Sequence, residues 1–273
     1  MDHQYSVLMS VYKKEKPEFL RKSIESMMHQ TVVPEDFVIV CDGPLTEDLD
    51  QILSDVKERY GKLFQIIRLP QNRGLGAALS EGLNYCKYEY VARMDSDDIS
   101  VPNRCEEEMA IFKDYDVAVV GGWIDEFSER ITEKGAVRTV PESSSDIRKY
   151  SRKRNPFNHP TVMFKKSAVQ DVGNYQTCYG FEDYQLWVRL LNAGYKGYNI
   201  PRVLVHMRVS DGMYTRRGGL SYFRKMISFW NYMRRNRYIS TADFIIAIMT
   251  RGMVSLIPVG LRQSVYGIFL RKK

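Results

Sequence analysis

Three aspartates lie close together in the chain, immediately after a run of mostly apolar residues. Asp95, Asp97 and Asp98 follow the segment Tyr90–Met94, and the chain then turns towards Pro102. In an extended segment, Asp95 and Asp97 face one way while Asp98 points elsewhere. Crowded carboxylates need a cation or hydrogen-bond donors, and a hard divalent ion completed by diphosphate oxygens is the usual solution. The alternative is a solvated turn in which Asp98 caps the next helix.

Three further segments place polar groups where a strand is expected to end or a helix to begin. Asp42 precedes a Gly-Pro pair, and it either accepts a hydrogen bond from a nucleobase imide or belongs to an ordinary turn. The segment Leu69–Gly76 precedes a helix, so its amides either approach a phosphate or ribose or form the first turn of that helix. The acids Glu182 and Asp183 open another helix, where the helix dipole alone would stabilise them.

The elements that must position these groups alternate between strand-like and helix-like patterns. We expect strands over Ser6–Val11, Phe37–Val40, Phe64–Leu69, Tyr88–Met94, Val117–Val120, Thr161–Phe164 and Leu204–Val209. Helical spacing predicts helices from Pro17 and around Leu49–Val56, Leu75–Tyr85, Met109–Phe112 and Tyr184–Leu191. This alternation predicts a mostly parallel, Rossmann-like α/β sheet with helices on both faces. Ligands of such sheets bind beyond the carboxyl ends of the strands.

Length and composition fit one large α/β domain with an appendage. The chain has 273 residues, of which 44% are hydrophobic and 27% charged, as in ordinary globular proteins. We predict one continuous domain over residues 1–215 and a helical tail over residues 216–273. The four cysteines are scattered and include no CxxC pair, which indicates thiols in a reducing compartment. The N-terminus has no signal-peptide pattern, so we expect a cytoplasmic protein.

The basic residues are concentrated in the tail. Residues 216–273 contain twelve Lys and Arg residues and one acid, Asp243, which gives +11; the formal +7 of the whole chain therefore leaves −4 for residues 1–215. This distribution predicts an anionic partner for the tail alone. Nucleic acid is not the expected partner, because the acidic remainder would repel a phosphate backbone.

The tail has apolar segments with basic flanks. The runs Phe244–Thr250 and Gly252–Leu261 fall short of the roughly 20 residues that a membrane-spanning helix needs. Amphipathic segments of this kind suit a membrane surface. Aromatic residues suited to the interface are Phe229, Trp230, Tyr232, Tyr266 and Phe269. We expect residues 222–273 to dock on an anionic membrane surface; the alternative is that they pack on the rest of the chain.

Five segments occur together in the order and spacing of a known family. They are Ser6–Tyr12, Val40–Gly43, Asn72–Gly74, Asp95–Asp98 and Glu182–Asp183. With these motifs, over about residues 4–215, the chain resembles the family 2 glycosyltransferases of the GT-A fold, in particular bacterial members that build capsular, exopolysaccharide and lipopolysaccharide chains. The resemblance implies an enzyme that moves a hexose-type sugar from a nucleotide-diphosphate donor, UDP-linked by family habit, to an acceptor hydroxyl.

The resemblance also assigns roles to particular residues. Those it places on the nucleotide sugar are Val11, Tyr12, Glu15, Asp42, Asn72, Gly74, Arg93, Asp95, Ser96, Arg208 and Arg216. Asp95 and Asp97 would hold the ribose and a Mn²⁺ or Mg²⁺ ion. Asp183, which forms the catalytic pair with Glu182, would remove the acceptor proton in a direct displacement with inversion.

The chain departs from the family at a late strand. Many relatives have Arg-x-His there, whereas this chain has His206, Arg208 and Ser210 at alternate positions, with Ser210 where the histidine is expected. The three side chains would share one strand face, so His206 is either a substitute metal ligand or a structural residue. In the following loop, Asp211–Gly219, Arg216 either clamps the diphosphate or faces solvent.

Two other functions compete with this interpretation. A nucleotidyltransferase would use the same metal carboxylates, but Ser10–Lys16 contains no glycine where a glycine-rich activation loop is expected. An inactive nucleotide-sugar-binding protein would bind without turnover, and the presence of Asp183 beside a complete Asp-x-Asp argues against it. His159 precedes a strand and either borders the sugar or acceptor or forms a turn. We therefore expect a metal-dependent enzyme on the inner face of the cell membrane, with a saccharide or lipid-linked saccharide as acceptor.

Overall fold

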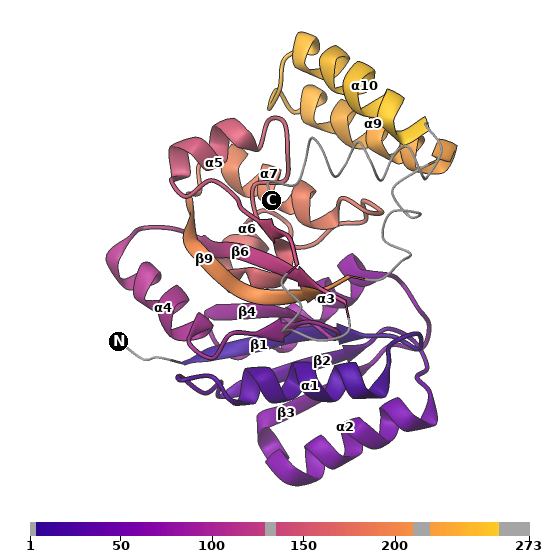
Figure 1. Cartoon of the computed structure of the whole chain (residues 1–273), viewed down its shortest axis with the longest axis vertical. Coiled ribbons are helices and arrows are strands. Elements are labelled where there is room, and N and C mark those ends of the chain that lie inside the picture. The colour runs from indigo at the N-terminus through magenta and orange to yellow at the C-terminus, as the bar shows by residue number, and fades with distance from the viewer. Residues whose placement is uncertain (1–3, 129–134, 210–218, 257–273) are drawn as a thin grey trace.

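The first half of the chain forms four parallel strands with helices between them. A computed structural model describes residues 4–128, 135–209 and 219–256 (Figure 1). The elements of this half are β1 (Tyr5–Val11), α1 (Pro17–Met28), β2 (Asp36–Cys41), α2 (Glu47–Tyr60), a 3-10 turn (Gly61–Leu63), β3 (Phe64–Arg68), α3 (Leu75–Tyr85) and β4 (Tyr90–Asp95). The strands lie in the order β3-β2-β1-β4, so their carboxyl ends share one edge of the sheet.

The second half extends the same sheet with strands of both directions. Its elements are β5 (Ile99–Ser100), α4 (Arg104–Asp114), β6 (Val119–Phe127), β7 (Val137–Arg138), α5 (Ser144–Tyr150), a 3-10 turn (His159–Thr161), β8 (Met163–Lys165), α6 (Lys166–Asp171), α7 (Glu182–Asn192) and β9 (Gly197–Arg208). β8 runs antiparallel to β4 and β6, whereas β6 and β9 are parallel. The long pairings are all parallel, which confirms a mostly parallel sheet.

Two strands of the second half are longer than predicted. β6 continues past Val120 to Phe127, and β9 begins at Gly197 instead of Leu204. The pattern ends early because Gly121 and Gly122 interrupt the apolar run. A Cβ atom on Gly122 would lie 2.5 Å from Leu204 Cδ1. These glycines therefore allow the close pairing of β6 with β9. A prediction from the pattern of apolar residues cannot detect this need for glycine, so it ends the strand too early.

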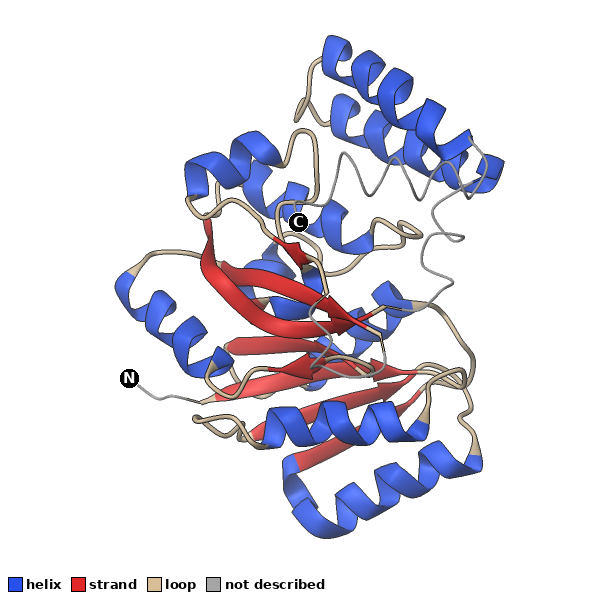
Figure 2. Cartoon of the chain, in the orientation of Figure 1, coloured by secondary structure: helices blue, strands red, loops and turns tan. Residues whose placement is uncertain are grey.

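Helices cover both faces of the sheet, as predicted (Figure 2). One core cluster joins the sheet to α1, α2 and α4, and the other joins it to α3, α6 and α7. At Gly82 of α3, a Cβ atom would lie 2.5 Å from Val40 Cγ2 and 2.6 Å from Leu8 Cδ1, so the helix rests directly on β1 and β2. The cysteines are free, and three of the four are buried.

The tail begins with a helix that belongs to the core. α9 (Gly219–Arg235) and α10 (Thr241–Leu256) form a helical hairpin. The ring of Phe229 lies 4.8 Å from that of Phe181 and 4.7 Å from that of Tyr184, between centroids. Phe229 and Trp230 are 0% and 2% exposed, so the expectation that they face a membrane is wrong.

The other aromatic residues of the tail are placed differently. Tyr232 is half-buried and packs against the same core, while Tyr266 and Phe269 lie outside the described residues. Within the described part of the chain, no helix is both long and apolar enough to cross a membrane.

Candidate active site

A buried arginine holds the first aspartate of the acidic loop. Arg93 and Asp95 share one face of β4, since they are two residues apart. Arg93 Nη1 donates to Asp95 Oδ2 at 2.5 Å, and Nη2 donates to Asp95 Oδ1. The arginine side chain is 2% exposed and the aspartate side chain 29%. The paired carboxylate is thus fixed at the end of β4 with part of its surface open to a ligand.

The next two aspartates are crowded with negative charge. Burial, followed by the charges of Asp95 and Glu15, raises the pKa of Asp97 to about 7. Asp98 is buried, and burial, followed by the charges of Asp95 and Asp97, raises its pKa. Asp98 Oδ1 accepts a 2.8 Å hydrogen bond from the backbone N–H of Arg208. Excess charge of this kind favours binding of a cation at Asp95 and Asp97.

Asp98 fastens the loop and does not cap a helix. The N-cap of α4 is Asn103, so the capping alternative is wrong. Arg208 completes the attachment, because its Nε donates to the carbonyl of Asp97 at 3.1 Å. Its guanidinium lies 3.7 Å from the ring centroid of Phe19 and 4.4 Å from that of Phe127. β9 therefore binds the acidic loop through the backbone amide and the stacked guanidinium of Arg208.

The loop after β1 meets the acidic loop. Ser96 Oγ donates to Glu15 Oε2 at 2.6 Å. Tyr12 is 38% exposed, whereas the side chain of Val11 is buried in the core. Val11 therefore reaches a ligand at most through its backbone, and its carbonyl already accepts the N–H of Asp42 at 2.8 Å.

Asp42 attaches the segment before α3 to the end of β2. Its Oδ1 accepts from the N–H of Arg73 at 2.7 Å and its Oδ2 from the N–H of Gly74 at 2.9 Å. Asn72 Nδ2 donates to the carbonyl of Asp42 at 3.2 Å. Each carboxylate oxygen retains a further lone pair. The structure thus shows Asp42 in a turn, as in the second alternative above. The remaining lone pairs of its carboxylate could still accept a hydrogen bond from a nucleobase.

The two acids at the start of α7 differ in their contacts. Asp183 Oδ2 accepts a 2.6 Å hydrogen bond from Asn155 Nδ2. Glu182 Oε2 accepts the N–H of Gly180 at 2.8 Å, and its Cγ would lie 2.8 Å from a Cβ on Gly76. Glu182 therefore packs α7 against the start of α3, whereas Asp183 is oriented by an amide from another segment.

Tyr175 is a buried residue whose hydroxyl is influenced by carboxylates of both groups of acids. Its hydroxyl is 2.9 Å from His159 Nε2. Burial raises the pKa of Tyr175, the charge of Arg93 opposes the rise, and the carboxylates of Asp183 and Asp95 add to it. Burial, followed by the charge of Arg93, lowers the pKa of His159, so its ring is neutral. Asp95 and Asp183, 88 residues apart in the sequence, thus act on one buried hydroxyl.

Sequence reasoning missed both Asn155 and Tyr175. Neither belongs to a recognisable motif, and each acts through a partner that only the fold brings near. Arg216 and Ser210 lie outside the described residues, so the structure does not place them.

The three predicted metal ligands are not gathered into one group. In the ranges that the structure describes, no cluster of three or more His, Cys, Asp or Glu side chains could hold a metal ion. His206 Nδ1 lies 2.6 Å from Asp125 Oδ1, which leaves Nε2 as its remaining ring nitrogen. Asp95 and Asp97 still fit a hard divalent ion, because Mg²⁺ commonly takes one or two carboxylates together with substrate phosphates.

A Rossmann-like sheet with acids at the carboxyl ends of its strands, followed by an acidic pair at the start of a later helix, is the arrangement of the GT-A glycosyltransferases. Residues 6–173 match the model of the family described as glycosyl transferase family 2. The chain belongs to this family and is therefore an enzyme of the glycosyltransferase class.

Similar curated proteins are bacterial glycosyltransferases. A UDP-Gal:alpha-D-GlcNAc-diphosphoundecaprenol beta-1,3-galactosyltransferase of Escherichia coli is 41% identical over 270 residues, which cover 98% of this chain and 97% of that protein. The amylovoran biosynthesis glycosyltransferase AmsE of Erwinia amylovora is 36% identical over 269 residues, covering 96% and 97%.

Solved structures share the fold at low identity. S. aureus TarS 1-349 in complex with UDP-GlcNAc aligns with a TM-score of 0.69 at 14% identity, over 98% of this chain and 76% of that one. The mannosyltransferase PcManGT from Pyrobaculum calidifontis, in complex with GDP-Man and Mn2+, aligns with a TM-score of 0.65 at 14% identity, over 97% and 81%. At these identities the likeness concerns the fold alone.

Proposed function

We propose that this glycosyltransferase moves a hexose-type sugar from a UDP-sugar to a hydroxyl of a lipid-linked saccharide, with inversion at the anomeric carbon. The observation that supports the proposal most directly is the carboxylate of Asp183 at the start of α7, whose Oδ2 accepts a hydrogen bond from Asn155. The E. coli relative supports the choice of substrates, because its name specifies a UDP-Gal donor and a diphosphoundecaprenol-linked GlcNAc acceptor.

Asp183 acts as the general base. The amide of Asn155 occupies Oδ2, which leaves Oδ1 to accept the proton of the acceptor hydroxyl. The acceptor oxygen attacks the anomeric carbon from the face opposite the diphosphate. As the new C–O bond forms, the bond to the leaving oxygen breaks, and the electron pair departs with UDP. Positioned proton transfer of this kind contributes about 10²–10⁴-fold to a rate.

The strand ends hold the donor. Tyr12, Asn72 and Arg73 are exposed beside the buried Asp42 and would contact the nucleoside, and Asp95, held by Arg93, would contact the ribose. Asp97 and Asp95 would hold a Mn²⁺ or Mg²⁺ ion together with the diphosphate oxygens. His206, which pairs with Asp125, is not gathered with these two carboxylates in the described part of the chain. A bound ion would offset the charge of the leaving diphosphate.

A donor panel tests the proposal. The full chain is incubated with UDP-hexoses and GDP-hexoses, with and without Mn²⁺, and with a GlcNAc-diphospholipid acceptor in detergent. We expect transfer from a UDP-hexose only when metal is present, and a product with inverted anomeric configuration by NMR. Equal transfer in excess EDTA would remove the metal from the proposal, and a product of retained configuration would contradict the role of Asp183.

A further inference from the structure

The geometry points to an anionic phospholipid surface as the partner of one end of the molecule, formed by the outer face of α10 and the basic residues of α5 and the α9–α10 turn. We call this end the α5–α10 surface. The inference rests on the proposed function only in its biological reason, namely that the acceptor is lipid-linked. The evidence for the surface is the exposure of its apolar side chains and its positive charge. Figure 1 shows α5, α9 and α10 together at the top of the molecule, with α2 at the opposite end.

α10 is apolar on both of its faces. Ala247 is buried, and Phe244 and Ile248 pack against the core on the inner face. On the outer face, Ile245, Ile246 and Met249 are 51%, 59% and 60% exposed. Met249 follows Ile246 by three residues and Ile245 by four, so its side chain neighbours both on the helix surface. A helix that is apolar all round is normally buried on all sides, so the outer face calls for an apolar partner.

Cations from two separate segments surround this helix. Lys149, Arg152 and Lys153 come from α5 and the turn after it, and Arg234, Arg235 and Arg237 come from the end of α9 and the turn before α10. Arg152 and Asp243 line one pocket, and Ser151 Oγ lies 2.5 Å from the hydroxyl of Tyr238, so the two segments are side by side. The acids on the same elements are Asp146, which pairs with Lys149, and Asp243. Six cations against two acids give the surface a net positive charge.

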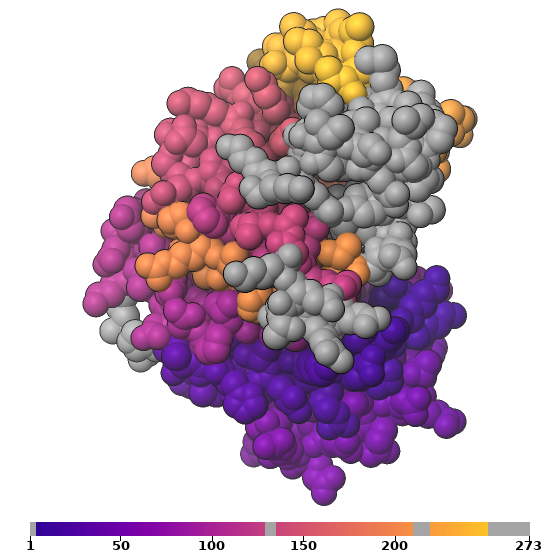
Figure 3. Space-filling view, in the orientation of Figure 1, coloured from indigo at the N-terminus to yellow at the C-terminus, as the bar shows by residue number. Residues whose placement is uncertain are grey.

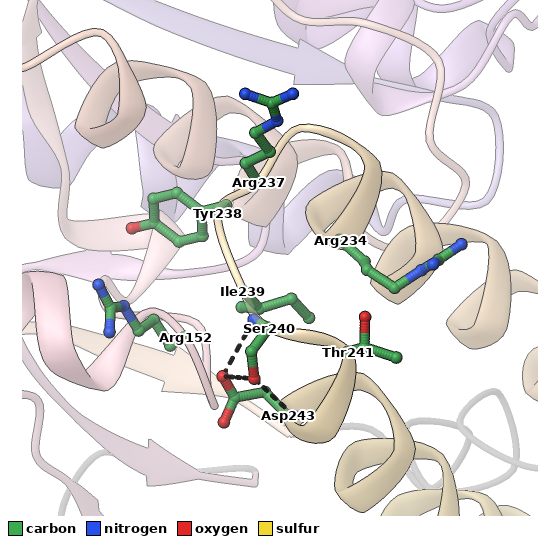
Figure 4. Close-up of a pocket in the computed structure, with 8 residues that line it drawn as sticks. All are labelled: Arg152, Arg234, Arg237, Tyr238, Ile239, Ser240, Thr241 and Asp243. Carbon is green, nitrogen blue, oxygen red and sulfur yellow. Dashed lines mark hydrogen bonds between the residues drawn. The ribbon is translucent and has the colours of Figure 1, made fainter.

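A pocket marks the junction of the two segments. It has a volume of about 470 Å³ and is lined by Arg152, Arg234, Arg237, Tyr238 and the start of α10. In Figure 4 the three guanidinium groups point in different directions and do not converge on one point. Spread charge of this kind suits a field of lipid phosphates rather than one bound anion. Figure 3 shows the exterior of α10, in yellow, at the upper end of the molecule.

The α5–α10 surface is connected to the proposed base. Ser151, at the end of α5, bonds the hydroxyl of Tyr238 through its Oγ at 2.5 Å, and its carbonyl accepts from the hydroxyl of Tyr184 at 2.8 Å. Tyr184 follows Asp183 directly. Ser151 therefore links the turn before α10 to the helix that carries Asp183 through two hydrogen bonds.

Vesicle flotation tests the inference with the full chain. The protein is mixed with vesicles of phosphatidylcholine, alone or with phosphatidylglycerol, at low and high salt. We expect flotation only with the anionic vesicles, weakened by salt, because each basic residue near an anionic surface strengthens binding about five-fold. Arg152→Glu with Arg237→Glu should weaken binding at least about ten-fold, and Ile246→Glu with Met249→Glu should weaken it comparably. Arg59→Glu with Lys62→Glu, at the α2 end, makes the same charge change and should bind normally.

Three results would overturn the inference. The first is equal recovery with neutral and anionic vesicles, and the second is an equal loss in the α2 control. The third is full binding by the Ile246 and Met249 variant together with complete loss on truncation after residue 256, which would place the contact in residues 257–273. Sugar transfer to an acceptor in detergent distinguishes the proposed lipid surface from the proposed function. The surface variants should lose vesicle binding and retain this transfer activity. If no lipid-linked acceptor is used but flotation follows the α5–α10 surface, the inference stands and the proposed acceptor fails.

Discussion

Single residues in this site act through crowding and orientation. Burial raises the pKa of Asp97, and the charges of Asp95 and Glu15 add to the rise. Asp183 owes its orientation to one amide, from Asn155. Both features are invisible in the motifs themselves, yet they set the charge and direction of the two carboxylates on which the proposed chemistry depends.

Replacement of Asp97 should affect stability and turnover in opposite directions. Since the folded-state pKa is about 7 and the usual value 3.8, the folded protein binds more protons between these limits, and stability falls as the pH rises through them. Without metal, Asp97→Asn should therefore be more stable than the wild type at pH 8, by up to about 4 kcal/mol. The difference should vanish near pH 4.

Thermal melts in EDTA at the two pH values measure this difference, and transfer assays with Mn²⁺ should show most turnover lost in the variant. A variant that melts below the wild type at pH 8 would show that the carboxylate is held by compensating contacts.

Variants of Asp183 and Asn155 distinguish the proposed general base from the residue that orients it. Asp183→Asn should lose transfer by about 10²–10⁴-fold while donor affinity stays the same. Asn155→Ala removes one hydrogen bond to the base and should lower kcat by about ten-fold, with the donor KM unchanged. Asn236→Ala is the control, because Asn236 is exposed and donates only to the carbonyl of Tyr232. A change in donor KM equal to that in kcat would assign Asn155 to donor binding instead.

At the scale of helices and strands, glycines allow close packing between neighbouring elements, and this packing determines how the strand ends align. α3 rests on β1 and β2 at Gly82, and β9 rests on β6 at the glycine pair Gly121 and Gly122. The first contact presents the segment before α3 to Asp42, and the second brings Arg208 to the acidic loop. Small residues at these positions are therefore part of how the site is assembled.

Gly82→Val should lower the free energy of unfolding by about 2–3 kcal/mol. Its Cβ alone would lie 2.5 Å from Val40 Cγ2 and 2.6 Å from Leu8 Cδ1, so core side chains must move. Asn84→Ala, on the exposed side of the same helix, should have little effect. Chemical denaturation of both variants measures the difference. An unchanged midpoint for Gly82→Val would mean that α3 shifts outward without cost.

At the scale of the whole molecule, the tail divides into a helix that completes the core and a helix that presents a surface. α9 contributes Met226, Phe229, Trp230 and Met233 to the cluster that also holds Tyr184 and Trp187 of α7. The boundary predicted at residue 215 therefore separates parts that share one core. α10 lies outside α9 and exposes apolar side chains.

Truncation after residue 215 should destabilise the protein instead of releasing a folded catalytic domain. Loss of a fully buried aromatic side chain such as Phe229 alone costs about 3–5 kcal/mol, which approaches the whole stability of many domains. Truncation after residue 256 keeps α9 and α10 and serves as the control. The soluble yield and the circular dichroism melt of each truncated form show whether it folds. A cooperative melt near the wild-type Tm for the shorter form would show that residues 1–215 fold independently.

The sequence by itself determined the α/β class, the limits of most elements in the first half and the family. Local periodicity is sufficient for these, because buried parallel strands read as apolar runs and the motifs at their ends are contiguous in the chain. Asp42, Asp95, Asp97 and Asp183 were singled out from such motifs, and their roles stay predictions.

The tertiary structure alone decided which groups meet. Asn155 at Asp183, Ser96 at Glu15, and Arg208 stacked against Phe19 join residues far apart in the sequence. It also decided that Phe229 is core and Ile246 is surface, although both lie in apolar, basic segments of the tail. The physical reason is the same in each case. Hydropathy shows that a side chain seeks an apolar partner, and only the packing of helices on the sheet shows which partner it finds.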